Sequence, residues 1–137
     1  MANILPDELA DELVTVCRTA TGDSLRSVVY FSRSNFEQLY LREDLEGGAD
    51  LVGFADVERL GFRAQMDYRG TELGEYLFTI RAFDEGYLMR VIAGDQGVFV
   101  TTDTMSRDRF EEVAASVRSI LREGEPELTG ASGSEPR

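Results

Sequence analysis

One stretch of the sequence, residues 73–121, constrains the fold more than any other. Apolar and polar residues alternate over 76–83, which is typical of a strand with one face buried. Short turns rich in Gly and Asp separate this strand from two more, at 87–93 and 98–102. Strands joined by such short turns pair as antiparallel hairpins, so the stretch predicts a three-stranded meander. The alternation places four residues on one face of the first strand: Tyr76, Phe78, Ile80 and Ala82.

A long amphipathic helix is predicted after the meander, over 106–122. Ser106 is a suitable N-cap, and Gly124 followed by Pro126 ends the helix. Residues 123–137 consist mainly of Gly, Ser, Pro and Glu, so we expect a disordered acidic tail after a single domain at 1–122. The predicted apolar side of the helix consists of Phe110, Val113, Ala114, Val117, Ile120 and Leu121.

The N-terminal part predicts a helix over 6–20 and then a hairpin of two strands, at 24–32 and 36–42. Residues 28–31 are apolar on both faces of their strand, so we expect layers on both sides of the sheet. We expect the central strand of the sheet to be 28–31 or 78–82.

The segment between the hairpin and the meander has a weaker pattern. Residues 43–50 predict an acidic loop, and the residues after it predict a short second helix that Gly61 ends. Residues 63–68 fit either an extra strand or an extended connector. The predicted buried side of the second helix consists of Leu51, Phe54, Val57 and Leu60.

The predicted order is therefore αββαβββα, a single α+β domain in which three helices flank a sheet of about five antiparallel strands. This order resembles the roadblock (dynein light chain) and profilin-like folds over residues 6–122. The resemblance implies one helix on one face of the sheet and both terminal helices on the other. Similar orders also occur in PAS- and GAF-like sensor domains.

The charge of the chain is strongly one-sided. It has 26 acidic and 14 basic residues, for a net charge of −12, and every basic residue is Arg. This composition is typical of halophilic proteins, because molar salt screens the repulsion among surface carboxylates. The alternative is an ordinary acidic cytosolic protein. An acidic surface also argues against binding to nucleic acid.

Two further sequence features bear on origin and location. Residues 36–45 are similar to a segment of small uncharacterised proteins from haloarchaea, a family without an assigned activity. The apolar runs are too short to span a membrane, and the N-terminus does not look like a signal peptide, so we expect a cytoplasmic protein without a membrane partner.

The residues that usually carry catalysis are scarce. The chain has no His, which excludes His-based triads and His metal sites, and its single cysteine, Cys17, is expected to be buried in the first helix. Residues 94–97 connect two strands rather than a strand and a helix, and Gly47-Gly48 lacks the Lys of a phosphate loop. Paired carboxylates are frequent by chance in so acidic a chain. We therefore expect no enzyme, cofactor or metal.

A candidate interaction site lies at the end of the second strand and consists of Tyr40, Arg42 and Asp44. Tyr40 and Arg42 are predicted to share a strand face, and both residue types are favoured at protein interfaces. Arg42 has a structural alternative, in which it pairs with a local carboxylate. Arg81 and Arg90, on adjacent strands, are expected to extend a polar face of the sheet.

The roadblock resemblance implies a non-enzymatic protein-binding or regulatory module. Such domains commonly form homodimers and serve as platforms for other proteins, often small GTPases. The alternative is a small-ligand sensor of the PAS/GAF kind, with a pocket between the sheet and a helix. An enzyme that uses carboxylates or a metal ion is the third reading, which the lack of His and Lys disfavours.

Overall fold

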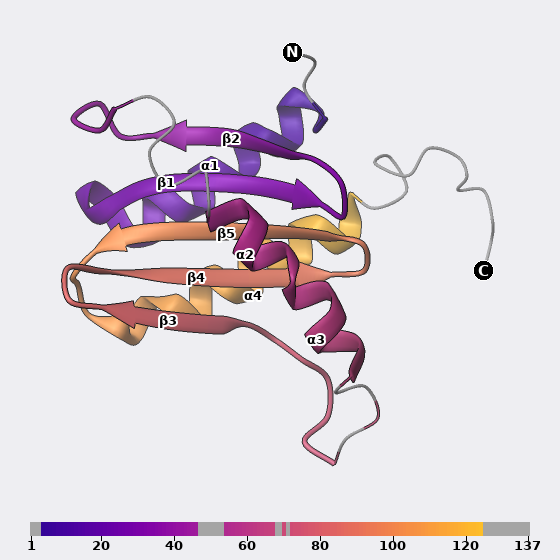
Figure 1. The fold of residues 1–137 in the computed structure, drawn as a ribbon. Coiled ribbons are helices and arrows are strands. Elements are labelled where there is room, and N and C mark those ends of the chain that lie inside the picture. The colour runs from indigo at the N-terminus through magenta and orange to yellow at the C-terminus, as the bar shows by residue number, and fades with distance from the viewer. Residues whose placement is uncertain (1–3, 47–53, 68–69, 71, 125–137) are drawn as a thin grey trace.

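The computed structural model describes residues 4–46, 54–67, 70 and 72–124 (Figure 1). It confirms a single α+β domain with a five-stranded antiparallel sheet. The predicted 123–137 tail lies almost wholly outside the described residues. The helices are α1 (Asp7–Thr21), α2 (Phe54–Arg59), α3 (Gly61–Asp67) and α4 (Phe110–Glu123), with single 3-10 turns at Gly22–Ser24 and Arg107–Arg109. The strands are β1 (Leu25–Ser32), β2 (Phe36–Leu41), β3 (Thr79–Phe83), β4 (Gly86–Ala93) and β5 (Gln96–Asp103).

The strands lie in the order β2-β1-β5-β4-β3 (Figure 1). The central strand is therefore β5, and the expectation that 28–31 or 78–82 would be central was wrong. The N-terminal hairpin adds to the meander through pairing of β1 with β5, which leaves β3 at one edge of the sheet and β2 at the other. Because β1, β4 and β5 are all largely buried, their hydrophobicity alone does not identify the middle strand.

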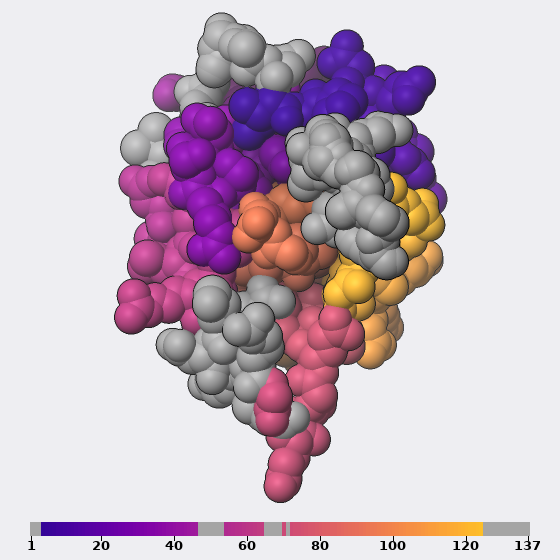
Figure 2. Space-filling model, turned by 90° about the vertical axis from the view of Figure 1, so that its right-hand side faces the viewer, coloured from indigo at the N-terminus to yellow at the C-terminus, as the bar shows by residue number. Residues whose placement is uncertain are grey.

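Helices cover both faces of the sheet. The terminal helices α1 and α4 pack on one face, and α2 with α3 crosses the other (Figures 1 and 2). Successive residues of β1 contribute to the two cores: Val28 packs with the terminal helices, and Val29 packs with Ala55 and Phe62 of the α2–α3 segment. The predicted apolar side of α4 is confirmed, because all six of its residues are buried.

The first strand of the meander is shorter than predicted. β3 begins only at Thr79, and Tyr76 does not share a face with Phe78 and Ile80. Phe78 and Ile80 pack on the side of the terminal helices, whereas Tyr76 packs against the core below α2 and α3. The alternation does not extend to Tyr76, because the residues before Thr79 are outside the strand and need not point to opposite faces in turn.

The segment between β2 and β3 also differs from the prediction. Residues 61–67 form α3, so neither the extra strand nor the extended connector is correct. The buried side of α2 and the start of α3 consists of Ala55, Glu58 and Phe62. The predicted buried side is exposed at Phe54, Val57 and Leu60, and Leu51 lies outside the described residues. α2 therefore lies on the sheet with the side chain of Glu58 facing inward.

Candidate functional site

The outer surface of α2 carries an exposed apolar stripe. Phe54 and Val57 of α2 and Leu60, the residue after it, follow one another at helical spacing and are 38%, 51% and 70% exposed, although one edge of the Phe54 ring packs against Phe99 of β5. Scattered apolar residues are common on protein surfaces, but a contiguous stripe usually marks a binding site. The stripe is thus the first part of a candidate interaction surface.

The open edge of the sheet comes near the first residue of this stripe, Phe54. Within the described residues, β3 pairs with β4 alone, so its other edge has no neighbouring strand. Phe83, at the end of β3, is 57% exposed, and it lines a small hollow of about 240 Å³ together with Phe54 of α2. We call the α2 stripe (Phe54, Val57, Leu60), Phe83 and the β3 edge together the open surface.

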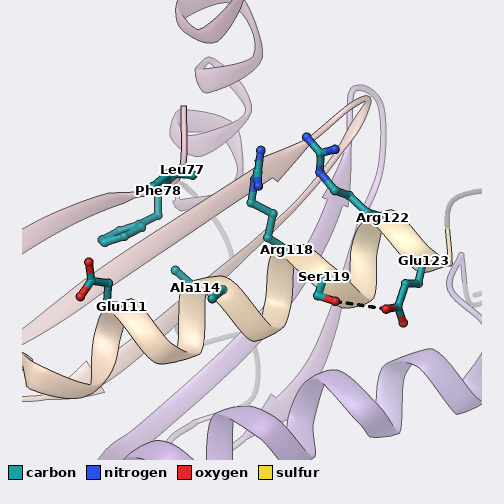
Figure 3. A pocket seen from close by; sticks show the side chains of 9 residues that line it. Leu77, Phe78, Glu111, Ala114, Arg118, Ser119, Arg122 and Glu123 are labelled. Carbon is teal, nitrogen blue, oxygen red and sulfur yellow. Dashed lines mark hydrogen bonds between the residues drawn. The ribbon is translucent and has the colours of Figure 1, made fainter. Parts of the chain in front are cut away.

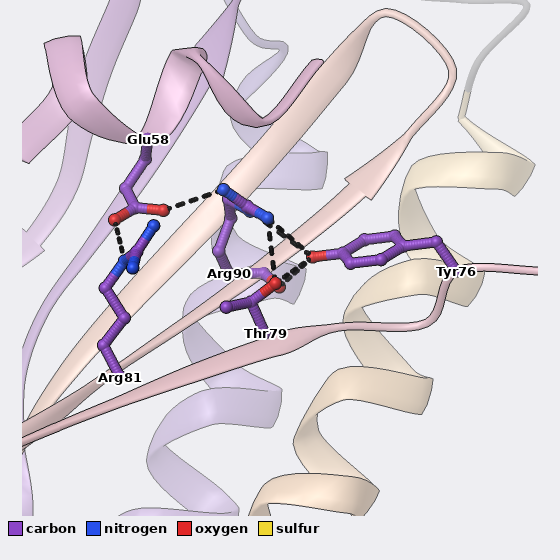
Figure 4. A network of polar contacts seen from close by, with 5 residues as sticks. All are labelled: Glu58, Tyr76, Thr79, Arg81 and Arg90. Atoms are coloured by element: carbon purple, nitrogen blue, oxygen red, sulfur yellow. Dashed lines mark hydrogen bonds and ion pairs between the residues drawn. The ribbon is translucent and has the colours of Figure 1, made fainter. Parts of the chain in front are cut away.

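A buried polar network holds α2 against β3 and β4 (Figure 4). Glu58 is 1% exposed, and its two carboxylate oxygens accept hydrogen bonds from Arg81 Nε at 2.8 Å and Arg90 Nη1 at 3.1 Å. Arg90 Nη2 also donates to Thr79 Oγ1 at 2.8 Å, and the Tyr76 hydroxyl donates to the Arg90 carbonyl at 3.0 Å. The network therefore joins α2, two strands and the connector before β3.

The network depends on a close approach that a side chain would block. A Cβ added at Gly61 would lie 2.3 Å from Arg90 Nη1, so only glycine leaves room for the guanidinium there. Removing charges from water is costly, and a buried pair offsets that cost only when its geometry is good and its remaining donors are satisfied. Here the pair fixes how α2 lies, and hence which side of α2 faces outward.

β2 departs from the regular alternation that the sequence predicts, for a local reason. Gln38 pairs with Val29 and Tyr40 pairs with Val28, so Leu39 is an extra residue in β2. Such a bulge shifts the alternation by one residue. Tyr40 therefore packs on the side of the terminal helices, where the guanidinium carbon of Arg18 lies 5.3 Å from its ring centroid.

Arg42 and Asp44 belong to a cluster at the end of β2. Arg42 Nε lies 2.7 Å from Asp44 Oδ1, and its Nη1 lies 2.7 Å from Asp103 Oδ2 and donates to the Asp23 carbonyl at 2.9 Å. The hydrogen bonds that Arg42 donates to Asp103 and Asp44 raise the pKa of Arg42, and the bond to Asp44 lowers the pKa of that carboxyl. These contacts give Arg42 a structural role, and the interaction role of Tyr40, Arg42 and Asp44 stays a prediction.

The other candidate groups offer little for chemistry. Cys17 is fully buried, as expected, and desolvation raises the pKa of its thiol to about 12, which leaves it protonated and unreactive. The described residues contain no group of three or more His, Cys, Asp or Glu side chains that could hold a metal ion. None of the described helices is both long and apolar enough to cross a membrane.

Comparison with known proteins places this geometry in a family and a fold. The model of a family described as a domain of unknown function (DUF7522) matches residues 11–122. No curated protein matches the sequence.

Three solved structures share the fold at low identity. The Roadblock/LC7 domain from Streptomyces avermitilis is 16% identical with a TM-score of 0.57, covering 90% of this chain and 98% of its own. MglB in a tetrameric arrangement is 14% identical with a TM-score of 0.60, covering 87% and 94%. The gliding protein MglB from Thermus thermophilus is 17% identical with a TM-score of 0.53, covering 85% and 90%. The fold is therefore that of the roadblock/LC7 proteins.

Proposed function

Because the chain belongs to the family described as a domain of unknown function (DUF7522), its function has to be inferred from its fold and surface, and we propose that it is a non-enzymatic, homodimeric platform for another protein. The observation that carries this proposal is the open surface, in which an apolar stripe lies near a strand edge that has no neighbouring strand among the described residues. The fold shared with roadblock/LC7 and MglB structures, one of them in a tetrameric arrangement, supports a small regulatory or protein-binding module.

A second copy of the chain is the occupant that fits the open surface best. An edge strand pairs readily with another strand, and two identical edges pair antiparallel about a two-fold axis. Arg81 is the middle residue of β3, so in a symmetric pairing it lies opposite its own copy. The α2 stripes of the two copies then lie on the same face of a continuous sheet and can bury each other.

The charges near the edge are compatible with this pairing. Two like charges directly opposite each other would destabilise a strand pair. Each Arg81, however, already has Glu58 as its partner at 2.8 Å. The repulsion that remains is between two chains of net charge −12, and high salt screens it. We infer that dimers form more readily in concentrated KCl, in the cytoplasm of a halophilic archaeon.

The partner that such a platform serves is inferred from the fold resemblance. Roadblock-like domains often serve as platforms for small GTPases, so we propose a small GTPase as the second partner. The acidic surface makes a nucleic-acid partner unfavourable. Pull-down from a halophilic lysate with the wild-type chain and with a dimer-deficient variant tests whether GTPase binding needs the dimer.

The dimer itself is tested by a substitution in the stripe. Leu60→Asp places a charge in the apolar stripe of the proposed interface, and the side chain is 70% exposed, so the fold of the single chain is unaffected. In about 2–3 M KCl, light scattering after size exclusion should give twice the chain mass for the wild type and a single mass for Leu60→Asp. Leu73→Asp, at a 97% exposed position outside the open surface, should remain dimeric.

Two results contradict the proposal. One is a wild-type chain that stays monomeric at high protein concentration in concentrated KCl. The other is a Leu60→Asp variant that dimerises as strongly as the wild type, which would move the interface elsewhere.

A further inference from the structure

A groove lies on the face of the sheet that the terminal helices cover, opposite the face covered by α2. The helix α4 and the chain that leads into β3 enclose about 620 Å³ (Figure 3). This volume is within the range of about 300–1,000 Å³ that is usual for small-molecule sites. Leu77 and Phe78 form one apolar wall, and Ala114 and Ala115 of α4 form the other.

Two arginines converge at one end of this groove. Arg118 and Arg122 point from α4 toward the chain before β3 (Figure 3), and their Nη2 atoms lie 2.7 Å and 2.6 Å from the same atom, Oε2 of Glu75. The Nε of Arg118 is buried and has no acceptor among the described residues. An arginine usually binds a carboxylate through two parallel hydrogen bonds, so Arg118 has an unused donor beside a carboxylate that it already holds.

Glu75 is a weak occupant of this position. Its side chain is 62% exposed, and its pair with Arg122, which is 51% exposed, contributes little to stability, whereas Arg118 is 19% exposed. The position therefore accepts a carboxylate, and the side chain that fills it is itself open to solvent.

The remaining charges of the groove restrict its ligand. Glu123 is held by Ser119 at the arginine end, at 3.3 Å. Glu111 lies at the opposite end, below Phe78 (Figure 3). A second anionic group on the ligand would meet Glu111, so the chemistry fits a molecule with one negative head and an apolar body.

We propose that this groove binds a small amphiphilic carboxylate. Its carboxylate takes the place of Glu75 between Arg118 and Arg122, and its apolar part lies along Leu77 and Phe78. An acidic peptide is a different occupant, but the cations are confined to one end of the groove and do not form the row that a peptide backbone with several acidic residues requires. The site adds ligand binding to the proposed platform and does not depend on the dimer.

Calorimetry with potassium decanoate, in the lowest KCl that keeps the chain folded, tests the site. Glu75→Gln frees both arginines and should tighten decanoate binding several-fold, whereas Arg118→Gln should weaken it about tenfold, as expected for the loss of a charged hydrogen bond. Arg109→Gln removes an exposed arginine of the neighbouring 3-10 turn and should leave binding unchanged. Decanol, which lacks the carboxylate, should bind much more weakly than decanoate.

Three results would overturn the proposal. They are no binding of decanoate to either wild type or Glu75→Gln, equal affinity for decanoate and decanol, and binding of an acidic apolar peptide without binding of decanoate. Because Glu75 is exposed, its variant keeps the test valid even if Arg118→Gln fails to fold. Light scattering on the same samples reports the dimer separately, so failure of one proposal is not mistaken for failure of the other.

Discussion

At the scale of single residues, Arg42 shows how one side chain can join segments that are far apart in the sequence. It follows β2, yet it contacts a carboxylate after β2, a carbonyl before β1 and Asp103 at the end of β5. The guanidinium makes these contacts at once because it has five donors in a fixed plane. Arg42 therefore connects the end of β2, the segment before β1 and the end of β5 to one another.

We predict that Arg42→Gln lowers the free energy of unfolding by about 1 kcal/mol, the usual contribution of a partly exposed charged hydrogen-bond cluster. Urea denaturation at constant KCl measures the change. Arg109→Gln, which removes an exposed pair with Glu112, should lower it by less than about 0.5 kcal/mol. Equal effects of the two substitutions would contradict the role of Arg42.

The same pair gives a pH dependence with a defined sign. Arg42 lowers the pKa of Asp44 below its ordinary value of 3.8 in the folded chain. The ionised Asp44 therefore stabilises the fold at pH values above 3.8. That contribution is lost as the pH falls from 3.8 through the lowered native pKa. The stability difference between wild type and Arg42→Gln should therefore shrink over this range, and a constant difference would argue against the pairing.

The sequence predicted part of this cluster. Asp44 is two residues from Arg42, and the structural reading of Arg42 foresaw a local carboxylate partner. Asp103 is 61 residues away and comes close only because β1 pairs with both β2 and β5. The position of Tyr40 could not be foreseen, because the bulge at Leu39 has no Gly or other marker in the sequence.

At the scale of elements, α2 shows why a helical apolar stripe is ambiguous. Phe54, Val57 and Leu60 have the spacing of a buried helix face, and the pattern does not distinguish a core from a partner surface. The sequence did contain one indication of which side of α2 faces the sheet. Arg81 and Arg90 were predicted on one polar sheet face, and two neighbouring arginines there favour a carboxylate partner, which Glu58 of α2 supplies.

We predict that Glu58→Gln lowers the free energy of unfolding by about 3–5 kcal/mol, because it leaves Arg90, 7% exposed, as a buried charge without its partner. Urea denaturation followed by circular dichroism measures this. Asp56→Asn, at the exposed neighbouring pair with Arg59, should change stability by less than about 1 kcal/mol.

A double substitution tests whether the stability depends on the charge of the Glu58–Arg90 pair or on the space that the two side chains fill. Glu58→Leu combined with Arg90→Met removes both charges and should recover much of the lost stability, since well-packed apolar residues can replace a buried pair. If Glu58→Gln is as mild as Asp56→Asn, the network does not hold α2 in place.

At the scale of the whole molecule, the element order was predictable and the strand order was not. Local patterns placed the hairpin, the meander and the terminal helices correctly, because each depends on residues close in sequence. The insertion of β5 between β1 and β4 depends on pairing between residues about seventy positions apart, such as Ser27 with Thr101. Local periodicity carries no information on such pairing.

Salt dependence is the property that belongs to the whole molecule. A net charge of −12 spread over a small domain opposes folding through self-repulsion, and the Debye length falls from about 10 Å at 0.1 M salt to about 3 Å at 1 M. We therefore predict that the thermal midpoint, followed by circular dichroism, falls steadily as KCl is diluted from about 3 M to about 0.1 M. Sucrose strengthens apolar burial without screening charge, so it should restore only part of the loss. Full recovery in sucrose would assign the effect to burial, and an equal midpoint at both KCl concentrations would contradict the halophilic origin that we predict from the composition.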